Sequence, residues 1–427
     1  MLPKSSAIAA VVVAVAALSP TAVRTVAAPE AQRFWPEWRG PLGTGEAPLA
    51  TPPRQWDGTK NVAWKVAVPG VGKSSPVVWN DLVVLTTAVP KDASPEPDLE
   101  WTVIAYNRAD GAVKWRRVVK SGKPHEGHHK DGTFASGSAL TDGTRIYAYM
   151  GSRGLYALDM KGTVLWQKDF GLMRTRNGFG EGSSATVHGS TLVITWDHEE
   201  ADFVAAFDSA TGKELWRQTR DEPTTWATPH VVVHNGKPQV VVNGTNRLIS
   251  YDLATGTPVW QTAGTTLNVI PSPVSANGMV YAMAGFRGNS LKAIKLAEAK
   301  GEVTGTSAVA FTYDKDTPYV PSPLLYKGGL YFLKSNSGIL TQLDAATGAV
   351  RYMQRLEAAP NVYASPVGAN GLVYILGREG TTVVLEAGPE FKVVATNVID
   401  EPIDASPAVV DKELYIRGAK HLYRISS

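Results

Sequence analysis

The feature that most constrains the fold of this chain is a strand-start mark that recurs eight times along it. In six copies a small residue precedes proline and leads into β-branched residues: Ser75-Pro76, Thr228-Pro229, Ser272-Pro273, Ser322-Pro323, Ser365-Pro366 and Ser406-Pro407. Two degenerate copies, Ser138-Ala139 and Ser184-Ala185, fill the gap between the first and the next. Because proline has no N–H to donate, it suits the first residue of a strand. The mark therefore predicts eight strand starts.

A tight-turn signal between two apolar runs follows each strand start within a few residues. The eight copies are Asn80-Asp81, Asp142-Gly143, His188-Gly189, Asn235-Gly236, Asn277-Gly278, Gly328-Gly329, Asn370-Gly371 and Asp411-Lys412. Asn-Gly and its relatives tolerate the positive φ that two-residue hairpins require. Each strand start is thus expected to open a β-hairpin.

A third mark is an Asp or Asn, then Thr-Gly or a relative, then an aromatic residue. It is complete in Ala206–Trp216 (AFDSATGKELW), and close copies are Asn107–Gly111–Trp115, Asp159–Gly162–Trp166, Asp252–Gly256–Trp260 and Asp344–Gly348–Tyr352. A repeat of about 40–50 residues is the length of a four-stranded propeller blade. No long 3.6-residue periodicity appears, which argues against helices. The regular aromatics are interpreted as packing between blades.

The two ends of the repeat region complement each other. Asn61–Val66 is a closing strand without a beginning, and Ser406–Ile425 is a beginning without an aromatic end. Pairing the first strand with the last three leaves the ring no free sheet edge. We therefore predict an all-β, eight-bladed propeller of four-stranded antiparallel blades over residues 61–427, preceded by a signal peptide (1–28) and a lead-in segment (29–60).

The N-terminal residues have the pattern of a cleavable signal peptide. Lys4 supplies the positive region, and Ala7–Leu18 is an uncharged Ala/Val stretch. This stretch is shorter than the roughly 20 residues of a membrane-spanning helix. The chain has no cysteine, which excludes a lipoprotein anchor, disulfides and thiolate metal sites. A periplasmic or secreted protein is expected, and a net charge of only +3 gives no support to a nucleic-acid partner.

The unit Ala206–Trp216 resembles the tryptophan-docking repeat of the pyrroloquinoline-quinone (PQQ) propeller superfamily. The lead-in Trp35–Gly40 (WPEWRG) is similar to the start of small BamB-like repeat proteins. The BamB-like resemblance implies a non-enzymatic propeller with protein or peptide partners in the cell envelope. The quinoprotein resemblance implies PQQ held with Ca²⁺. Quinoprotein alcohol dehydrogenases place a vicinal cysteine pair against the quinone, and this chain lacks cysteine.

Ligand sites in a propeller usually form on the face where the loops entering the inner strands and the loops joining second to third strands crowd around the central channel. Those loops carry one cation in most blades together with amides and an aromatic residue. The candidate ligand-binding residues are Arg176, Asn177, Trp226, Arg247, Arg287, Lys334, Asn336, Arg378 and Arg417. Converging cations would bind a small anionic ligand. The alternative is that each cation pairs with a carboxylate such as Asp197, Glu379 or Asp404 and serves the fold.

Two loops, Pro124–Gly132 and Trp196–Glu200, combine histidines with carboxylates. Their candidate metal ligands are His125, His128, His129, Asp197 and His198, since imidazole and carboxylate suit divalent ions. The alternative is a pair of solvated loops, because neither segment has an established ligand spacing. If the chain were an oxidoreductase, Asp197 or Glu199 would be the candidate general base.

The residues thus leave three functions open. The leading hypothesis is a non-catalytic binding or scaffold propeller in the envelope, without a membrane-spanning segment in the mature chain. The first alternative is a PQQ-dependent oxidoreductase with a metal at the channel mouth. The second is a carbohydrate-binding or carbohydrate-cleaving propeller that uses Trp196, Trp226 and the arginines.

Overall fold

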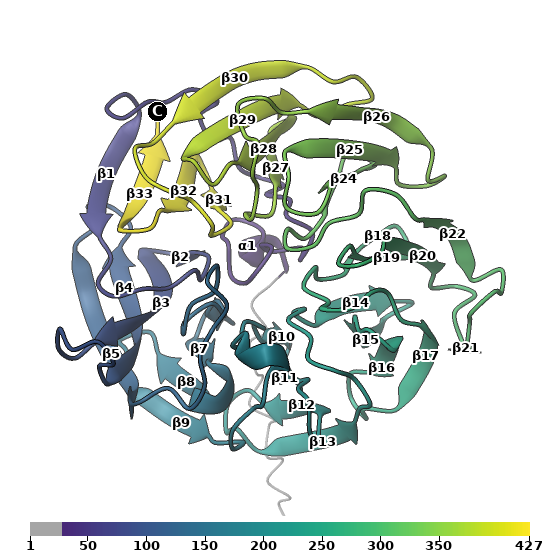
Figure 1. Ribbon diagram of the computed structural model, residues 1–427, viewed down its shortest axis with the longest axis horizontal. Coiled ribbons are helices and arrows are strands. Elements are labelled where there is room, and N and C mark those ends of the chain that lie inside the picture. The colour runs from purple at the N-terminus through teal and green to yellow at the C-terminus, as the bar shows by residue number, and fades with distance from the viewer. Residues whose placement is uncertain (1–27) are drawn as a thin grey trace, which may run out of the picture.

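The computed structural model describes residues 28–427 as eight β-sheets arranged in a ring around a central axis (Figure 1). The predicted all-β propeller is confirmed. The predicted signal peptide lies outside the described residues except for its last position. The helical segments are α1 (Ala28–Ala31), η1 (Gly151–Arg153) and η2 (Arg176–Gly178). None of the helices in this described range has the length and apolar character needed to cross a bilayer.

The first four blades follow the chain from the innermost strand outward. Blade 1 comprises β2 (Val77–Trp79), β3 (Leu82–Pro90), β4 (Leu99–Asn107) and β5 (Val113–Gly122). Blade 2 comprises β6 (Leu140–Thr141), β7 (Arg145–Tyr149), β8 (Leu155–Asp159) and β9 (Val164–Lys168). Blade 3 comprises β10 (Thr186–His188), β11 (Thr191–Trp196), β12 (Phe203–Asp208) and β13 (Glu214–Thr219). Blade 4 comprises β14 (His230–His234), β15 (Lys237–Val242), β16 (Arg247–Asp252) and β17 (Pro258–Ala263).

The last four blades repeat this order, and the final one closes the ring. Blade 5 comprises β18 (Val274–Ala276), β19 (Met279–Ala284), β20 (Ser290–Lys295) and β22 (Val309–Tyr313). Blade 6 comprises β23 (Leu324–Tyr326), β24 (Gly329–Leu333), β25 (Ile339–Asp344) and β26 (Val350–Arg355). Blade 7 comprises β27 (Val367–Ala369), β28 (Leu372–Leu376), β29 (Thr381–Glu386) and β30 (Val393–Val398). Blade 8 comprises β31 (Ala408–Val410), β32 (Glu413–Arg417), β33 (His421–Ser426) and the N-terminal β1 (Val62–Ala67).

The ring closes as the sequence predicts. β1 pairs antiparallel with β33, so that Trp64 lies opposite Arg424 and Ala67 opposite His421. Two predicted hairpin turns are displaced by one residue: β10 ends at His188, which shifts that turn to Gly189-Ser190, and β24 begins at Gly329, which shifts that turn to Lys327-Gly328. Both displaced turns still have a positive φ at their first residue, so the turn chemistry is unchanged.

The burial of each strand follows from its place in the blade. The second and third strands are covered on both sides by neighbouring blades, so β12 is buried from Phe203 to Phe207. The outermost strands face solvent, and in β13 the residue buried is Trp216. This indole donates from Nε1 to the carbonyl of Leu253 in blade 4 at 2.9 Å. The aromatic at the end of a blade therefore fastens it to the next one.

The Thr-Gly turn of one blade contacts the aromatic residue of the preceding blade. Gly212 has φ +70°, and a Cβ there would lie 2.7 Å from the Trp166 indole of blade 2. Asp208 accepts hydrogen bonds from the N–H and the hydroxyl of Thr211 and so holds the turn. Glycine is required both by the left-handed backbone and by the close approach of the ring.

Blade 4 departs from the predicted four strands, because a fifth strand, β21 (Gly301–Glu302), pairs in parallel with β17. The connection in blade 5 is longer and extends outward to Trp260 and Gln261, and the glycine of its Thr304-Gly305 pair does not contact the Trp260 ring. The Trp260 indole accordingly donates to the Gln239 side chain of its own blade at 3.2 Å.

The lead-in segment enters the channel. The purple chain crosses the centre of the ring in Figure 1. Trp35 exchanges backbone hydrogen bonds with Val78 of β2, and Ala47 donates to Gly368 of β27. Phe34, Trp35, Ala47, Ala50 and Trp56 belong to one apolar core with blades 7, 8 and 1. Residues 34–56 therefore form part of the folded ring rather than a tail.

Candidate functional site at the channel mouth

The central channel is narrowed by a ring of eight hydroxyl residues that stand at the strand starts, here called the hydroxyl ring: Ser75, Ser138, Ser184, Thr228, Ser272, Ser322, Ser365 and Ser406. Each backbone N–H from Ser75 to Ser365 donates to the hydroxyl oxygen of the next blade, over seven bonds of 2.8–3.1 Å. At the eighth junction the Ser75 hydroxyl is buried with no partner among the described residues. Arg417 of blade 8 bridges that junction by donating to the Ser74 hydroxyl and the Thr86 carbonyl.

The sequence contained a signal for this ring that was interpreted only as a strand start. In blades 2 and 3 the proline is replaced by Ala139 and Ala185, whereas Ser138 and Ser184 are kept. The hydroxyl is therefore the invariant part of the mark within this chain. The hydroxyl is kept for a geometric reason, because at seven of the eight junctions its oxygen accepts the backbone N–H of the preceding blade.

One side of the hydroxyl ring is closed by the lead-in segment. The Trp38 indole donates from Nε1 to the Ser272 hydroxyl at 3.2 Å. Next to it, the buried Arg39 donates from Nη2 to the carbonyls of Pro323 and Pro366 at 2.9 and 2.8 Å. Burial without a carboxylate partner lowers the pKa of Arg39 to about 9. Trp38 consequently forms the floor of the space on the other side of the ring.

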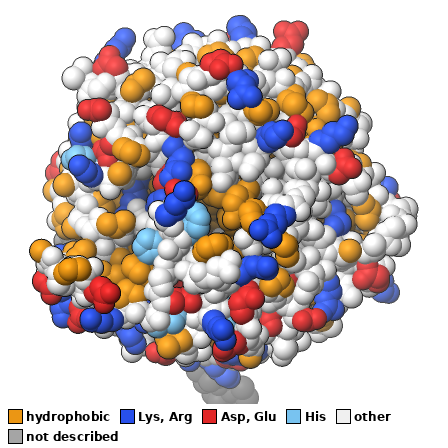
Figure 2. Space-filling model, viewed as in Figure 1, with side chains coloured by type: hydrophobic (Ala, Val, Ile, Leu, Met, Phe, Trp, Pro, Cys, Tyr) orange, Lys and Arg blue, Asp and Glu red, His pale blue; other side chains and the backbone are white. Residues whose placement is uncertain are grey.

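That space is a cavity of about 210 Å³ at the channel mouth, here called the mouth cavity. Its wall comes from the loops that precede the inner strands, with Trp38 and six members of the hydroxyl ring at its base. Basic, histidine and apolar side chains gather near the middle of this face in Figure 2. The aromatic and charged lining residues are Trp38, Lys73, His129, Asp131, Phe179, Glu181, Trp226, Tyr319, Tyr363 and Asp404.

One wall of the mouth cavity is an ion-paired cluster, here called the mouth cluster: Lys73, Asp131, Tyr363, Arg378 and Asp404. Arg378 binds Asp404 through Nε and Nη2 at 2.7 and 3.2 Å and reaches Asp131 at 3.0 Å. Its guanidinium lies over the Tyr363 ring at 3.9 Å. Lys73 completes the cluster with an ion pair to Asp404 at 2.6 Å.

The mouth cluster favours the charged form of Asp131. Burial alone would raise the pKa of Asp131, but the hydrogen bond and charge of Arg378 outweigh it and lower that pKa. The same carboxylates raise the pKa of Arg378. Each cation of the cluster thus faces a carboxylate.

Glu181 lies on the opposite side and lines both the mouth cavity and a smaller cavity of about 40 Å³ beside it. Its carboxylate accepts hydrogen bonds from the backbone N–H and the hydroxyl of Ser152. Burial nevertheless raises its pKa. Trp226 also lines both cavities, and its Nε1 donates to the Gly180 carbonyl at 2.7 Å.

Among the five candidate metal ligands, His125 alone enters a group compatible with an ion within the described range, together with Glu126 and Glu181. This group is already bonded within the protein. His125 accepts a hydrogen bond from Arg153 at 2.8 Å and contacts the Met173 carbonyl through Nε2 at 2.7 Å. Glu126 accepts from the backbone N–H of Thr175 at 3.2 Å. The Arg153 charge opposes a cation here.

The remaining candidate metal ligands have separate partners. His198 is buried between the N–H of Arg174 and the carbonyl of Ala201. His128 contacts the carbonyl of His129 through Nδ1 at 2.7 Å. His129 lies at the rim of the mouth cavity, 3.7 Å from Asp131.

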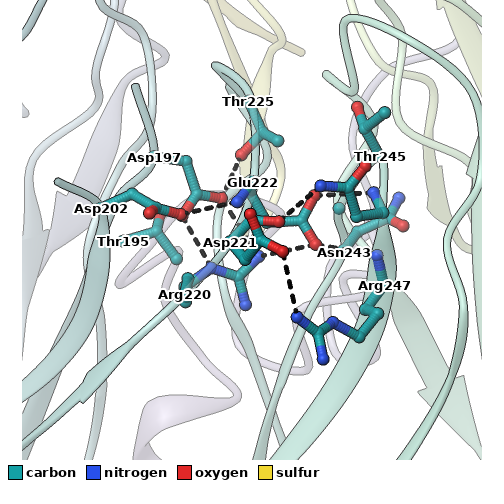
Figure 3. A network of polar contacts seen from close by, with 12 residues as sticks. Thr195, Asp197, Asp202, Arg220, Asp221, Glu222, Thr225, Asn243, Thr245 and Arg247 are labelled. Atoms are coloured by element: carbon teal, nitrogen blue, oxygen red, sulfur yellow. Dashed lines mark hydrogen bonds and ion pairs between the residues drawn. The ribbon is translucent and has the colours of Figure 1, made fainter. Parts of the chain in front are cut away.

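Asp197, the candidate general base, belongs to a buried network between blades 3 and 4 (Figure 3). Arg220 binds it at 2.7 and 3.1 Å, and both side chains are essentially unexposed. Thr225 donates to the same carboxylate at 2.6 Å. Burial would lower the pKa of Arg220, but the adjacent carboxylates outweigh it and raise that pKa. The second candidate base, Glu199, is exposed and accepts hydrogen bonds from the N–H and hydroxyl of Thr224.

Of the nine candidate ligand-binding residues, all within the described range, Trp226 lines the mouth cavity and Arg378 stands behind its wall. The others lie away from it. Arg247 pairs with Asp221 at 3.6 Å, Lys334 pairs with Asp316 at 2.7 Å, and Asn336 accepts the Val320 N–H.

Three further candidates also serve local contacts or face solvent. Arg287 lies over Phe286 at 5.4 Å. Arg176 donates its backbone N–H to the Thr224 hydroxyl, and Asn177 is exposed with φ +53°. The nine residues therefore do not form one converging cationic ring.

The family model described as outer membrane protein assembly factor BamB matches residues 55–198 and 200–427. This chain belongs to that family. Among solved structures, BamB from Moraxella catarrhalis is similar at a TM-score of 0.58 and 13% identity, over 85% of this chain and 99% of that one. A comparison with curated protein sequences gives no match.

Members of another functional class share the fold with this BamB-family chain. A europium-containing methanol dehydrogenase is similar at a TM-score of 0.62 and 11% identity, over 91% of this chain and 90% of that one. A quinohemoprotein alcohol dehydrogenase from Pseudomonas putida HK5 is similar at 0.62 and 13%, over 94% and 81%. At these identities the likeness shows the fold alone.

Proposed function

We propose that this protein is a non-catalytic binding propeller of the cell envelope whose ligand site is the mouth cavity. The observation that carries the proposal is the charge state of that cavity. Its cations are paired with its carboxylates, and the candidate bases Asp197 and Glu199 are bonded to protein groups outside it. Paired cations, and candidate bases that lie outside the cavity, suit binding better than proton transfer.

The fold raises the alternative of a PQQ-dependent oxidoreductase, and the residues of the mouth cavity do not fit that quinone. A carboxylated quinone needs unpaired cations, whereas Lys73 and Arg378 are bound to Asp404 at 2.6 and 2.7 Å. Three carboxylates, of Asp131, Glu181 and Asp404, line the same space and would repel an anion. Each member of the group His125, Glu126 and Glu181 likewise accepts a hydrogen bond from a protein donor.

An envelope location is supported by membership of the BamB family and by the predicted signal peptide. The description of the family, outer membrane protein assembly factor, favours a role with protein partners in the same compartment. Because Trp38 forms the floor of the mouth cavity, we expect such partners to bind on the mouth face rather than inside the channel.

The test is a quinone assay with purified mature protein. PQQ is added with Ca²⁺ or with a lanthanide ion, and bound quinone and dye-linked oxidation of alcohols and sugars are measured. We expect neither stoichiometric quinone binding nor turnover. One equivalent of bound quinone with turnover would overturn the proposal. Because a weak result could reflect damaged protein, thermal unfolding of the same sample is recorded as the control.

A further inference from the structure

We propose that the mouth cavity binds one uncharged, polyhydroxylated ring, that is, a neutral saccharide unit. This inference rests on the proposed non-catalytic binding function and specifies its ligand. It follows from three properties of the cavity, namely its size with its aromatic lining, its charge balance and its free hydroxyl groups.

The size and the aromatic lining favour a single ring. Cavities for drug-sized ligands measure about 300–1,000 Å³, whereas the mouth cavity measures about 210 Å³. Trp38 lies at its base, and Trp226 and Phe179 line its sides. Trp38 is held by its bond to Ser272, and Trp226 by its bond to Gly180. Fixed indoles offer apolar surface to the C–H face of a ring without losing rotamer freedom.

The charge balance favours an uncharged ligand. An anion would find no unpaired cation, because Lys73 and Arg378 are already ion-paired, and it would approach the carboxylates of Asp131 and Asp404. A cation would meet Lys73 and Arg378, which are paired with Asp131 and Asp404, while the third carboxylate, of Glu181, already accepts two hydrogen bonds from Ser152. A neutral ligand avoids both costs and can still accept hydrogen bonds from Lys73 or donate them to the aspartates.

The hydroxyl ring favours a ligand that both donates and accepts hydrogen bonds. Ser138, Ser184, Ser365 and Ser406 line the cavity, and each hydroxyl oxygen accepts one backbone N–H. The O–H of each of these four serines has no acceptor within the described residues. A hydroxyl has one donor and two acceptor positions, so each serine can still engage a ligand hydroxyl. These serine hydroxyls therefore complement the hydroxyl groups of a sugar better than they complement an apolar ring.

The experiment compares four probes that share one ring size, by saturation-transfer NMR followed by calorimetry on the full mature protein. Methyl β-glucopyranoside and N-acetylglucosamine are neutral, glucuronate is anionic and glucosamine is cationic. We expect a neutral probe to bind with a dissociation constant of about 1 mM, a modest affinity for one ring. We expect glucuronate and glucosamine to bind about tenfold more weakly than that probe.

A matched pair of variants tests whether the neutral probe binds in the mouth cavity. Trp226→Phe removes the Nε1 donor and part of the ring surface at the mouth, and Trp166→Phe removes the same groups at an interblade position, where Nε1 donates to Ser209. We expect Trp226→Phe to lower the affinity for the neutral probe about tenfold. We expect Trp166→Phe to leave the affinity of the folded protein for that probe unchanged.

Binding of no neutral probe, tighter binding of a charged one, or equal effects of the two variants would overturn the inference. These outcomes differ from failure of the proposed function, which would appear as quinone turnover.

Discussion

Two arginine–aspartate pairs in this molecule have nearly the same geometry and different surroundings. Arg220 binds Asp197 at 2.7 and 3.1 Å, and Arg378 binds Asp404 at 2.7 and 3.2 Å. The first pair has side-chain exposures of 0% and 1%, and the second has 28% and 13%. The first is enclosed between two blades, whereas the second borders the mouth cavity.

Bond geometry alone therefore does not distinguish an ion pair that borders a ligand cavity from one that is enclosed between blades. The enclosed pair is satisfied further by Thr225 and Tyr251 and has no contact with solvent. Its contribution is to the packing of blades 3 and 4. In the pair at the mouth, Asp404 lines the cavity and has acceptor positions left for a ligand.

The largest expected effect comes from breaking the enclosed pair. Asp197→Asn removes the hydrogen-bonded carboxylate and leaves the buried Arg220 with Glu222 at 4.0 Å, and we expect a loss of about 3 kcal/mol in the free energy of unfolding. Asp404→Asn removes the equivalent charge at the mouth and should cost about 1 kcal/mol or less, because solvent screens the released cations.

Urea unfolding at neutral pH measures the free energy of unfolding of Asp197→Asn and of Asp404→Asn. The double variant Asp197→Leu with Arg220→Met serves as the control, since apolar replacement of both partners removes the stranded charge. Equal losses for Asp197→Asn and Asp404→Asn would contradict the comparison.

A smaller effect concerns Glu37, a carboxylate on the closed side of the channel that accepts a hydrogen bond from Thr186 at 2.9 Å. Burial raises the pKa of Glu37 to about 7, from 4.5 in the unfolded chain. The folded state then binds more protons than the unfolded state between these values, so stability falls as pH rises through this window. The expected loss is about 2 kcal/mol after allowance for partial exposure.

Unfolding free energies of wild type and Glu37→Gln, measured at pH values below and above this window, check the effect. The variant should lack this segment of the pH dependence and should equal or exceed the wild type at the higher pH. Identical pH profiles for the two proteins would show that Glu37 ionises normally.

Much of the fold could be predicted because its determinants are local. A strand start, a hairpin turn and a Thr-Gly turn are each written within a few residues, as in Ala206–Trp216. Closure by β1 followed from counting incomplete repeats at the two ends. The fifth strand of blade 4 was missed, because Gly301–Glu302 carries no strand pattern and pairs only through its position beside Trp260.

Most of the candidate site could not be predicted, because it depends on which loops meet. Arg378 pairs with Asp131, 247 residues away in sequence, and that proximity exists only once the ring is closed. Asp197 was a candidate base since a polar residue after a strand is usually exposed, yet Arg220 draws it inside. Trp38 was noted within the lead-in motif, but nothing local indicates that it enters the channel.

The central claim is that charge pairing at the mouth cavity selects an uncharged ligand, and a charge exchange tests it most directly. Asp131→Asn with Asp404→Asn releases Lys73 and Arg378 without changing side-chain size. Calorimetry then compares glucuronate with methyl β-glucopyranoside on wild type and on this double variant, after urea unfolding has shown that the variant is folded. The account predicts that the double variant gains about tenfold in affinity for glucuronate relative to the neutral sugar. An unchanged preference between the two sugars would contradict it.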